Sequence, residues 1–128
     1  MSQCTIYTVQ INHLREAILK DIPAIDITVK SGELAFAPTW DMVWGSKMGT
    51  LSNARYEAEY TEMMLASQKK HPEVWQKALA LTEVALACYC PPGKFCHRHL
   101  LKRMLINLHL REGVDVVDGG EFLPQGTP

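Results

Sequence analysis

The sequence lacks long apolar runs, an excess of charge of either sign and a recognisable export signal. No stretch approaches the roughly 18 consecutive apolar residues that span a membrane, and no basic start is followed by an apolar core. We therefore expect a cytoplasmic protein with no membrane partner. Thirteen Lys and Arg residues against fourteen Asp and Glu leave a formal net charge of −1, whereas proteins that grip nucleic acid through overall charge are strongly basic. The composition thus argues against nucleic acid as a partner.

The chain is also too short and too evenly composed to predict a second domain. Its 128 residues, 47% hydrophobic and 21% charged, are typical of one globular unit with a conventional core. We assign residues 1–122 to a single domain. Residues 123–128 contain two prolines and one glycine, which predicts a flexible C-terminal tail.

Hydrophobic spacing along the chain alternates between the periods of strands and helices. Residues 84–90 are almost wholly apolar, as in a strand covered on both faces in the middle of a parallel sheet. Between residues 32 and 49 the periodicity fades, which predicts a long irregular loop. The predicted strands are residues 5–9, 24–29, 84–90 and 114–117, and the predicted helices begin near Leu14, Asn53, Pro72 and Cys96. This order predicts an α/β domain of three layers, with helices on both faces of a mainly parallel central sheet.

Cysteine is scarce, but three of the four cysteines lie within the nine residues 88–96. In a chain without an export signal, this grouping favours reduced thiols, chemistry or a metal over a disulfide framework. Cys96 and His97 are expected in the first turn of a helix, where unpaired amide hydrogens and the positive end of the dipole favour an anion such as a thiolate or a phosphate. We therefore predict that Cys96 and His97 are catalytic. Arg98 adds a planar guanidinium suited to phosphate or carboxylate.

A second group of side chains is expected at the same edge of the sheet. Ligands of parallel α/β sheets bind outside the carboxyl ends of the strands, and the loops after residues 29 and 90 both lie there. Aromatic side chains could stack on a planar ligand while a lysine and a serine at a strand end meet its charged part. The predicted ligand-binding residues are Arg98, Cys90, Lys30, Ser31, Thr28, Trp40, Trp44 and Tyr60. They predict a small anionic, phosphate-bearing or nucleotide-like ligand, held by an enzyme or a sequestering protein that needs no cofactor.

Alternative interpretations of the cysteine-rich segment remain open. Seven residues separate Cys90 from Arg98, not the five of a phosphatase cradle, so that class is disfavoured. A structural zinc site could draw on several residues, although their spacing is not that of a recognised ribbon or knuckle. The possible zinc ligands are Cys88, Cys90, Cys96, His97 and His99. Taken alone, Cys88 is more simply a small buried hydrophobic residue.

Two interaction surfaces are further alternatives. Residues 94–103 carry cations and no acid, which could form a local basic face for nucleic acid even in a chain of balanced charge. Its cations are Lys94, Arg98, Lys102 and Arg103. Trp40 and Trp44 could equally serve a contact between two copies of the chain, so a homodimer is a further possibility.

Several of these segments together resemble the family known as domain of unknown function 488, with phage-borne members the most similar. The resemblance runs from Cys4 to Gly120, and its most specific part is Cys96-His97-Arg98 opening a helix after the buried strand. The other matching segments are Ile6-Tyr7-Thr8, Asp26-Ile27-Thr28-Val29-Lys30, Ala37-Pro38-Thr39-Trp40, and a helix with Tyr56 and Tyr60.

The resemblance implies a Rossmann-like α/β fold in which the Cys-His-Arg segment and the polar end of the second strand form a pocket. It implies no activity. Many members carry Asp-Val-Arg at the second strand, whereas this chain has Asp26-Ile27-Thr28-Val29-Lys30, so its basic residue has moved along the chain.

Overall fold

A central parallel sheet organises the protein, as the sequence predicts. The structure is a computed structural model that describes residues 3–89 and 95–122; Cys90 and the predicted tail at 123–128 lie outside the described residues. The described strands form one sheet in the order β2-β3-β1-β4, and every neighbouring pair is parallel. They are β1 (Gln3–Gln10), β2 (Ala24–Asp26), β3 (Glu83–Cys88) and β4 (Asp115–Phe122).

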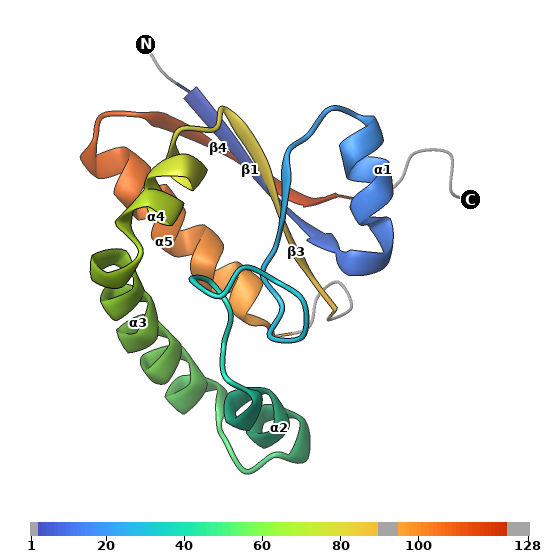
Figure 1. The fold of residues 1–128 in the computed structure, drawn as a ribbon, viewed down its shortest axis with the longest axis vertical. Coiled ribbons are helices and arrows are strands. Elements are labelled where there is room, and N and C mark those ends of the chain that lie inside the picture. The colour runs from blue at the N-terminus through green and yellow to red at the C-terminus, as the bar shows by residue number, and fades with distance from the viewer. Residues whose placement is uncertain (1–2, 90–94, 123–128) are drawn as a thin grey trace.

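Helices cover both faces of this sheet, which gives the predicted three layers (Figure 1). The short α1 (Leu14–Leu19), preceded by a 3-10 turn at Ile11–His13, lies on one face. The other face carries α3 (Asn53–Lys70), α4 (Pro72–Leu79) and α5 (His97–Arg111), while α2 (Trp40–Met48) lies beyond the end of the sheet. No helix in the described ranges is both long and apolar enough to cross a membrane.

Strand alternation sends successive side chains into two cores. Ile6 and Leu86 pack with α3, α4 and α5 in the larger core, whereas Val9 and Ala87 belong to the smaller core beneath α1. Residues 84–88 are all buried, because β3 is covered on both faces and lies between β2 and β1. The prediction of 84–90 as an interior strand is confirmed as far as Cys88, where β3 ends.

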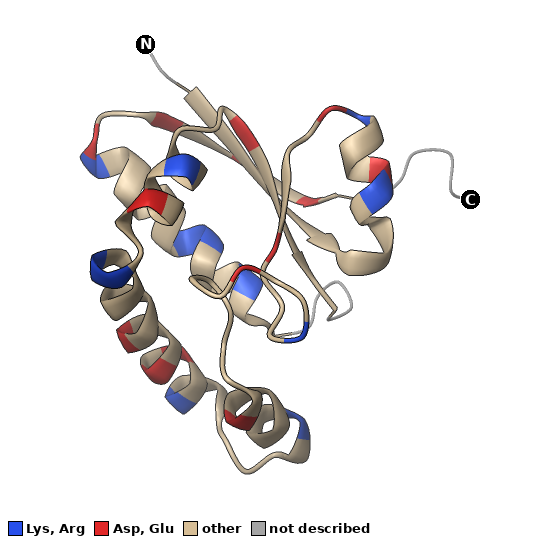
Figure 2. Ribbon diagram, in the orientation of Figure 1, with Lys and Arg blue, Asp and Glu red and all other residues tan. Residues whose placement is uncertain are grey.

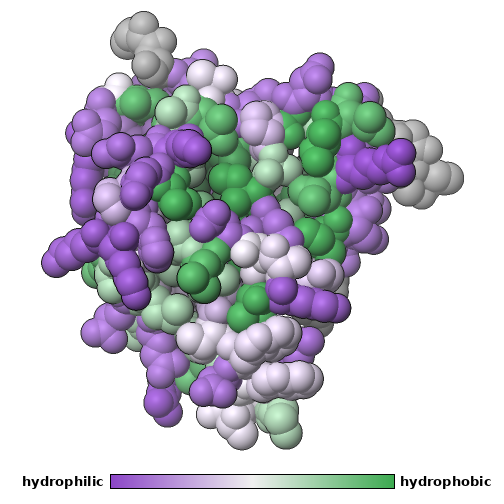
Figure 3. Space-filling model, viewed as in Figure 1, coloured by the Kyte–Doolittle hydropathy of each residue, from purple (hydrophilic) through white to green (hydrophobic). Residues whose placement is uncertain are grey.

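Apolar side chains also remain on the outer surface. Ile18 and Leu19 of α1 are 54% and 73% exposed, and Figure 3 shows hydrophobic side chains over this helix on the viewed face. Isolated exposed hydrophobic residues are common on folded proteins, so this pair indicates no partner by itself.

The structure differs from the sequence prediction in two segments, and in both of them a side chain accepts a hydrogen bond from a backbone amide. The strand predicted over 24–29 ends at Asp26, since the Asp26 carboxylate accepts hydrogen bonds from Thr28 and turns the chain. The loop predicted over 32–49 contains α2, which begins where the Thr39 hydroxyl accepts from the Met42 amide at 3.1 Å and ends at Gly49 with φ of 76°. The last strand is longer than predicted and runs to Phe122.

Candidate functional site

Two thiols and an imidazole meet at the carboxyl edge of the sheet. Cys88 is the last residue of β3, Cys96 is the N-cap of α5, and His97 is the first residue of that helix. The Cys88 and Cys96 sulfurs are 2.9 Å apart, and His97 Nδ1 lies 3.6 Å from Cys96 Sγ and 4.0 Å from Cys88 Sγ. All three residues are buried. We call this group the Cys-His cluster.

The hydrogen bond of His97 determines which nitrogen faces the sulfurs. His97 Nε2 lies 2.6 Å from the carbonyl oxygen of Ile27, just after β2. A carbonyl oxygen only accepts, so Nε2 carries a proton and donates it. In the neutral imidazole, Nδ1 then has a lone pair that faces the two sulfurs. One hydrogen bond thus joins the ends of β2 and α5 and orients the cluster.

Aromatic rings pack around the cluster. The Tyr60 ring lies edge-on to His97 with centroids 5.5 Å apart, and Tyr56 contacts Phe95 edge-on at 5.4 Å. Tyr60 is fully buried and donates from its hydroxyl to the Phe36 carbonyl oxygen at 2.7 Å. Burial is the main cause that raises the pKa of Tyr60 well above its usual value, so Tyr60 stays neutral and supports His97 from behind.

The cluster lines a cavity of about 450 Å³ at the end of the sheet. Its walls come from the turn after β2, from α2, from the end of β3 and from the start of α5. They combine lysines, hydroxyls and aromatic rings with the Cys-His cluster. Besides the cluster, the lining includes Thr28, Lys30, Trp40, Ser46, Lys47, Tyr56 and Phe95. The cavity is therefore amphipathic, with two cations near its aromatic walls.

Half of the predicted site residues come together in this cavity. Cys96, His97, Thr28, Lys30 and Trp40 all line it. Other predicted residues are absent from its described lining. Tyr60 lies behind His97, Ser31 donates to Asp26 Oδ2 at 2.6 Å, and Trp44 is 55% exposed with Lys47 Nζ 5.6 Å from its ring centre. Cys90 lies outside the described residues.

Arg98 is buried and lies beside an acid of β4. Its side chain has no exposure, and its guanidinium lies 3.5 Å from Glu121 Oε1. The same carboxylate oxygen accepts from the Thr8 hydroxyl at 2.6 Å. Arg98 therefore joins α5 to β4 and β1 beneath the sheet edge, and it is not among the described lining residues of the cavity. The predicted contact between Arg98 and a ligand stays a prediction.

The predicted basic face is largely neutralised by acids. Lys102 Nζ lies 3.1 Å from Asp118 Oδ1, and the Arg103 guanidinium lies 3.4 Å from Glu57 Oε1. Figure 2 shows acidic residues on α3 and basic residues on α5, the two helices that the pair of Arg103 and Glu57 joins. Arg98 is paired as described above, and Lys94 lies outside the described residues. These pairs leave little uncompensated positive charge for a phosphate backbone, which weakens the nucleic-acid alternative.

A compact turn after β2 positions Thr28 and Lys30 at the cavity. Asp26 Oδ1 accepts from the Thr28 amide at 2.9 Å and from the Thr28 hydroxyl at 2.7 Å, while Oδ2 accepts from Ser31. Burial acts to raise the pKa of Asp26, but the hydrogen bonds from Ser31 and Thr28 outweigh it, so the pKa lies below its usual 3.8. The charged carboxylate is therefore the form that holds this turn together.

We expect Asp26→Ala to lower the free energy of unfolding by about 2 kcal/mol, because donors of the turn lose a charged acceptor. The folded pKa is depressed, so this stabilisation is present above about pH 4 and is lost as the pH falls through the folded pKa. Urea unfolding at pH 7 and pH 3 tests this: the difference in unfolding free energy between the two proteins should be smaller at pH 3 than at pH 7. Asp115→Asn, at an exposed position on β4, is the control. An equal difference at both pH values would contradict the prediction.

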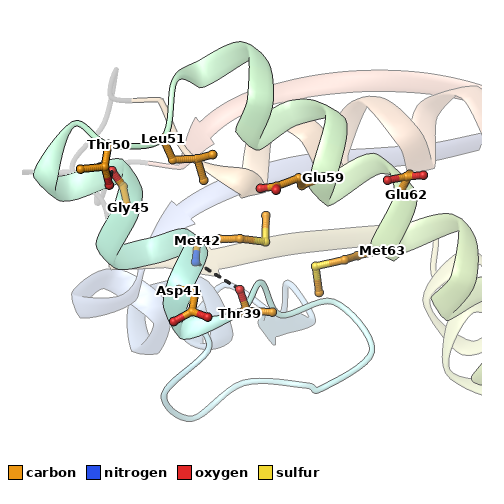
Figure 4. A pocket seen from close by; sticks show the side chains of 9 residues that line it. All are labelled: Thr39, Asp41, Met42, Gly45, Thr50, Leu51, Glu59, Glu62 and Met63. Atoms are coloured by element: carbon orange, nitrogen blue, oxygen red, sulfur yellow. Dashed lines mark hydrogen bonds between the residues drawn. The ribbon is translucent and has the colours of Figure 1, made fainter.

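A second cavity, of about 510 Å³, lies between α2 and α3 (Figure 4). Met42 and Met63 face each other across it, and Glu59, Glu62 and Asp41 stand around its rim. The three acids are exposed. The described lining of this cavity includes no thiol, no imidazole and no buried charged group. It is therefore a weaker candidate for a reactive site than the cavity beside the Cys-His cluster.

Comparison with known families gives one match. The chain matches DUF488-N3a, described as the active DUF488-N3 subclade, over residues 30–109, which is more than half of its length. The protein belongs to the DUF488 family. The matched segment runs from Lys30 through α2, α3, α4 and β3 into α5, so it contains the whole Cys-His cluster. No curated protein and no solved structure gives a significant match.

Some residues that line the cavity of this DUF488 protein are not predicted from the sequence. Val43 and Lys47 line one wall together with the predicted Trp40, because the three residues are three and four positions apart on α2, the spacing of one helix face. That spacing is visible in the sequence, but the surrounding glycines hid it by suggesting a loop. Tyr56 fits a packing stripe and does pack in the core, yet it also reaches the cavity. Cys88, taken alone, gave no signal beyond that of a buried strand residue.

Proposed function

We propose that the protein binds a small anionic, phosphate-bearing or nucleotide-like molecule in the cavity beside the Cys-His cluster. The observation that carries this proposal is the convergence of two lysines, an exposed tryptophan and the cluster on one cavity of about 450 Å³. Pockets for small ligands commonly have volumes of about 300–1,000 Å³ and combine apolar walls with a few polar groups.

The cavity wall offers positive charge for the anionic group of the ligand and aromatic surfaces for a planar ring. Lys30 comes from the turn after β2 and Lys47 from α2, so an anionic group between these elements would meet positive charge from two sides. Trp40 and Tyr56 offer flat apolar surfaces for a planar ring. Both thiols of the cluster face the same space, which would place a reactive group next to the bound molecule. The description of the matching subclade as active supports a site with chemistry.

The proposal covers an enzyme, in which Cys96 and His97 act on the ligand, and a sequestering protein. A phage-encoded protein could use the second to capture a host nucleotide signal. Both forms require binding, so binding is tested first. Isothermal titration with AMP, ribose 5-phosphate, inorganic phosphate and adenosine separates the contributions of charge and ring. AMP should bind more tightly than adenosine or phosphate alone. If none of the four compounds binds, the proposal fails.

We expect Lys47→Met to weaken AMP binding about tenfold, because a charged contact to phosphate is worth roughly 1.5–3 kcal/mol and the methionine keeps the apolar stem. Adenosine, which lacks the phosphate, should be affected much less. Titration of both compounds measures this difference. Lys77→Met, at an exposed position on α4 outside the described cavity lining, is the matched control and should leave both affinities unchanged. Equal losses for AMP and adenosine would show that Lys47 does not meet the anion.

A further inference from the structure

We propose that Cys88, Cys96 and His97 form a zinc site with three protein ligands and a fourth position open to the cavity. Among the described residues, these three bring their ligand atoms within 4.8 Å of one another, and all three are buried. Two cysteines and one histidine with an open fourth position are a known ligand set of catalytic zinc. The metal site stands independently of the proposed ligand, whereas the use of its open position rests on the proposed function.

Both nitrogen–sulfur distances in the cluster are close to those expected around a tetrahedral zinc ion, whereas the sulfur–sulfur distance is too short. Zn–S distances of about 2.3 Å and Zn–N distances of about 2.0–2.1 Å place sulfur and nitrogen ligands about 3.6 Å apart. His97 Nδ1 lies 3.6 Å from one sulfur and 4.0 Å from the other. The sulfurs are 2.9 Å apart, closer than the roughly 3.8 Å of two zinc-bound thiolates. Binding therefore requires the sulfurs to separate by about 1 Å, which small side-chain rotations can supply.

The histidine is already oriented as a metal ligand. A metal-binding imidazole typically donates its other N–H to a carbonyl or carboxylate, which fixes both the tautomer and the ring plane. His97 does this through Nε2 and the Ile27 carbonyl oxygen at 2.6 Å, which leaves the Nδ1 lone pair toward the sulfurs. Tyr60 packs edge-on against the ring and limits its rotation further. The imidazole would therefore lose little conformational entropy when a metal binds, because its orientation is already fixed.

The position of the cluster determines what the fourth ligand can be. Cys88, Cys96 and His97 all line the cavity, so water or a bound molecule can approach the metal from that side. Two thiolates would neutralise the charge of Zn²⁺, and the lysines of the cavity would attract an anion toward it. An oxygen of a phosphate-bearing ligand, or a water beside that ligand, is the group that this position would accept.

Metal titration of the full chain tests the site. After treatment with chelator and reductant, the protein should take up one Zn²⁺ per chain. Co²⁺ should give an intense near-ultraviolet band from thiolate-to-cobalt charge transfer, which Zn²⁺ then removes. Exhaustive titration that yields no stoichiometric uptake, or a cobalt complex without the thiolate band, would overturn the proposal. A disulfide between Cys88 and Cys96 that persists through treatment with the reductant would overturn it as well.

Alanine variants assign the ligands. Cys88→Ala and Cys96→Ala should each abolish the stoichiometric band, whereas Cys4→Ala, which removes a buried thiol elsewhere on the sheet, should keep it. Circular dichroism of the metal-free variants checks their fold. If a variant does not fold, alkylation of the wild-type chain decides: zinc should protect Cys88 and Cys96 from a thiol reagent and leave the labelling of Cys4 unchanged. Equal labelling with and without zinc would contradict the assignment.

The open position has its own readout. Adding cyanide or imidazole to the cobalt protein should change the visible d–d bands, because an exogenous ligand enters the fourth site. Unchanged bands would mean that the protein closes the site, and the open position would be wrong while the metal assignment holds. Zinc uptake without binding of any of the four compounds would refute only the proposed function, and binding of AMP without zinc uptake would refute only the metal site.

Discussion

Replacement of Arg98 with methionine is expected to lower the free energy of unfolding by about 3–5 kcal/mol. The Arg98 side chain has no exposure, and its guanidinium lies 3.5 Å from Glu121, whose side chain is only 17% exposed. Removing one partner of a buried ion pair leaves the other charge in a poorly solvated place, and that uncompensated charge costs more than the pair itself contributes. Thr8, which donates to the same carboxylate, cannot replace a full positive charge.

A double-mutant cycle measures this effect. Urea unfolding of Arg98→Met, Glu121→Gln and the double variant should show that the double variant is more stable than Arg98→Met alone. Arg103→Met is the matched control, because Arg103 is 66% exposed in its ion pair with Glu57 and exposed pairs contribute about 0–1 kcal/mol. If Arg98→Met and Arg103→Met lower the free energy of unfolding by the same amount, Arg98 does not form a buried ion pair with Glu121.

Cys96, His97 and Arg98 are adjacent in the sequence but lie in different surroundings, so the motif alone does not predict that all three side chains reach one site. The position at a helix start was correctly predicted, because an apolar strand followed by an amphipathic stripe defines that junction locally. Consecutive helical residues, however, point about 100° apart. His97 therefore faces the cavity, while Arg98 turns under the sheet toward Glu121, an acid at the far end of the next strand. Nothing in the local sequence shows that distant partner.

The same distinction between local and distant interactions explains which parts of the fold were predicted. The all-apolar residues 84–88 predicted an interior strand, and β3 is one. The helix starts predicted near Asn53 and Pro72 are confirmed, because capping and proline geometry act within a few residues. The helix α2 was missed because its composition resembles a loop, although the Thr39 cap and the Gly49 terminus were both present in the sequence. The cavity itself depends on α2, so its second lysine was missed too.

Gly32→Ala is expected to cost about 3 kcal/mol of stability and to weaken AMP binding at least tenfold. A Cβ at this position would lie 2.5 Å from the Asp26 carbonyl oxygen and 2.6 Å from the Thr28 carbonyl oxygen, and closer still to the Thr28 amide nitrogen. These are backbone atoms, so no side chain can rotate away to make room. The Gly32 amide also donates to the Thr28 carbonyl oxygen at 2.9 Å, and displacement would break that bond.

The loss of stability and the loss of AMP affinity in Gly32→Ala are expected to have the same cause. Displacing Gly32 moves the turn that presents Thr28 and Lys30 to the cavity, so stability and affinity should fall together. Urea unfolding and AMP titration on the same preparation measure both quantities. Glu33→Ala, which removes an exposed side chain at the next position, is the control and should change stability by less than about 0.5 kcal/mol. A destabilised Gly32→Ala that binds AMP normally would place the ligand away from this turn, because a site built on Thr28 and Lys30 cannot survive their displacement.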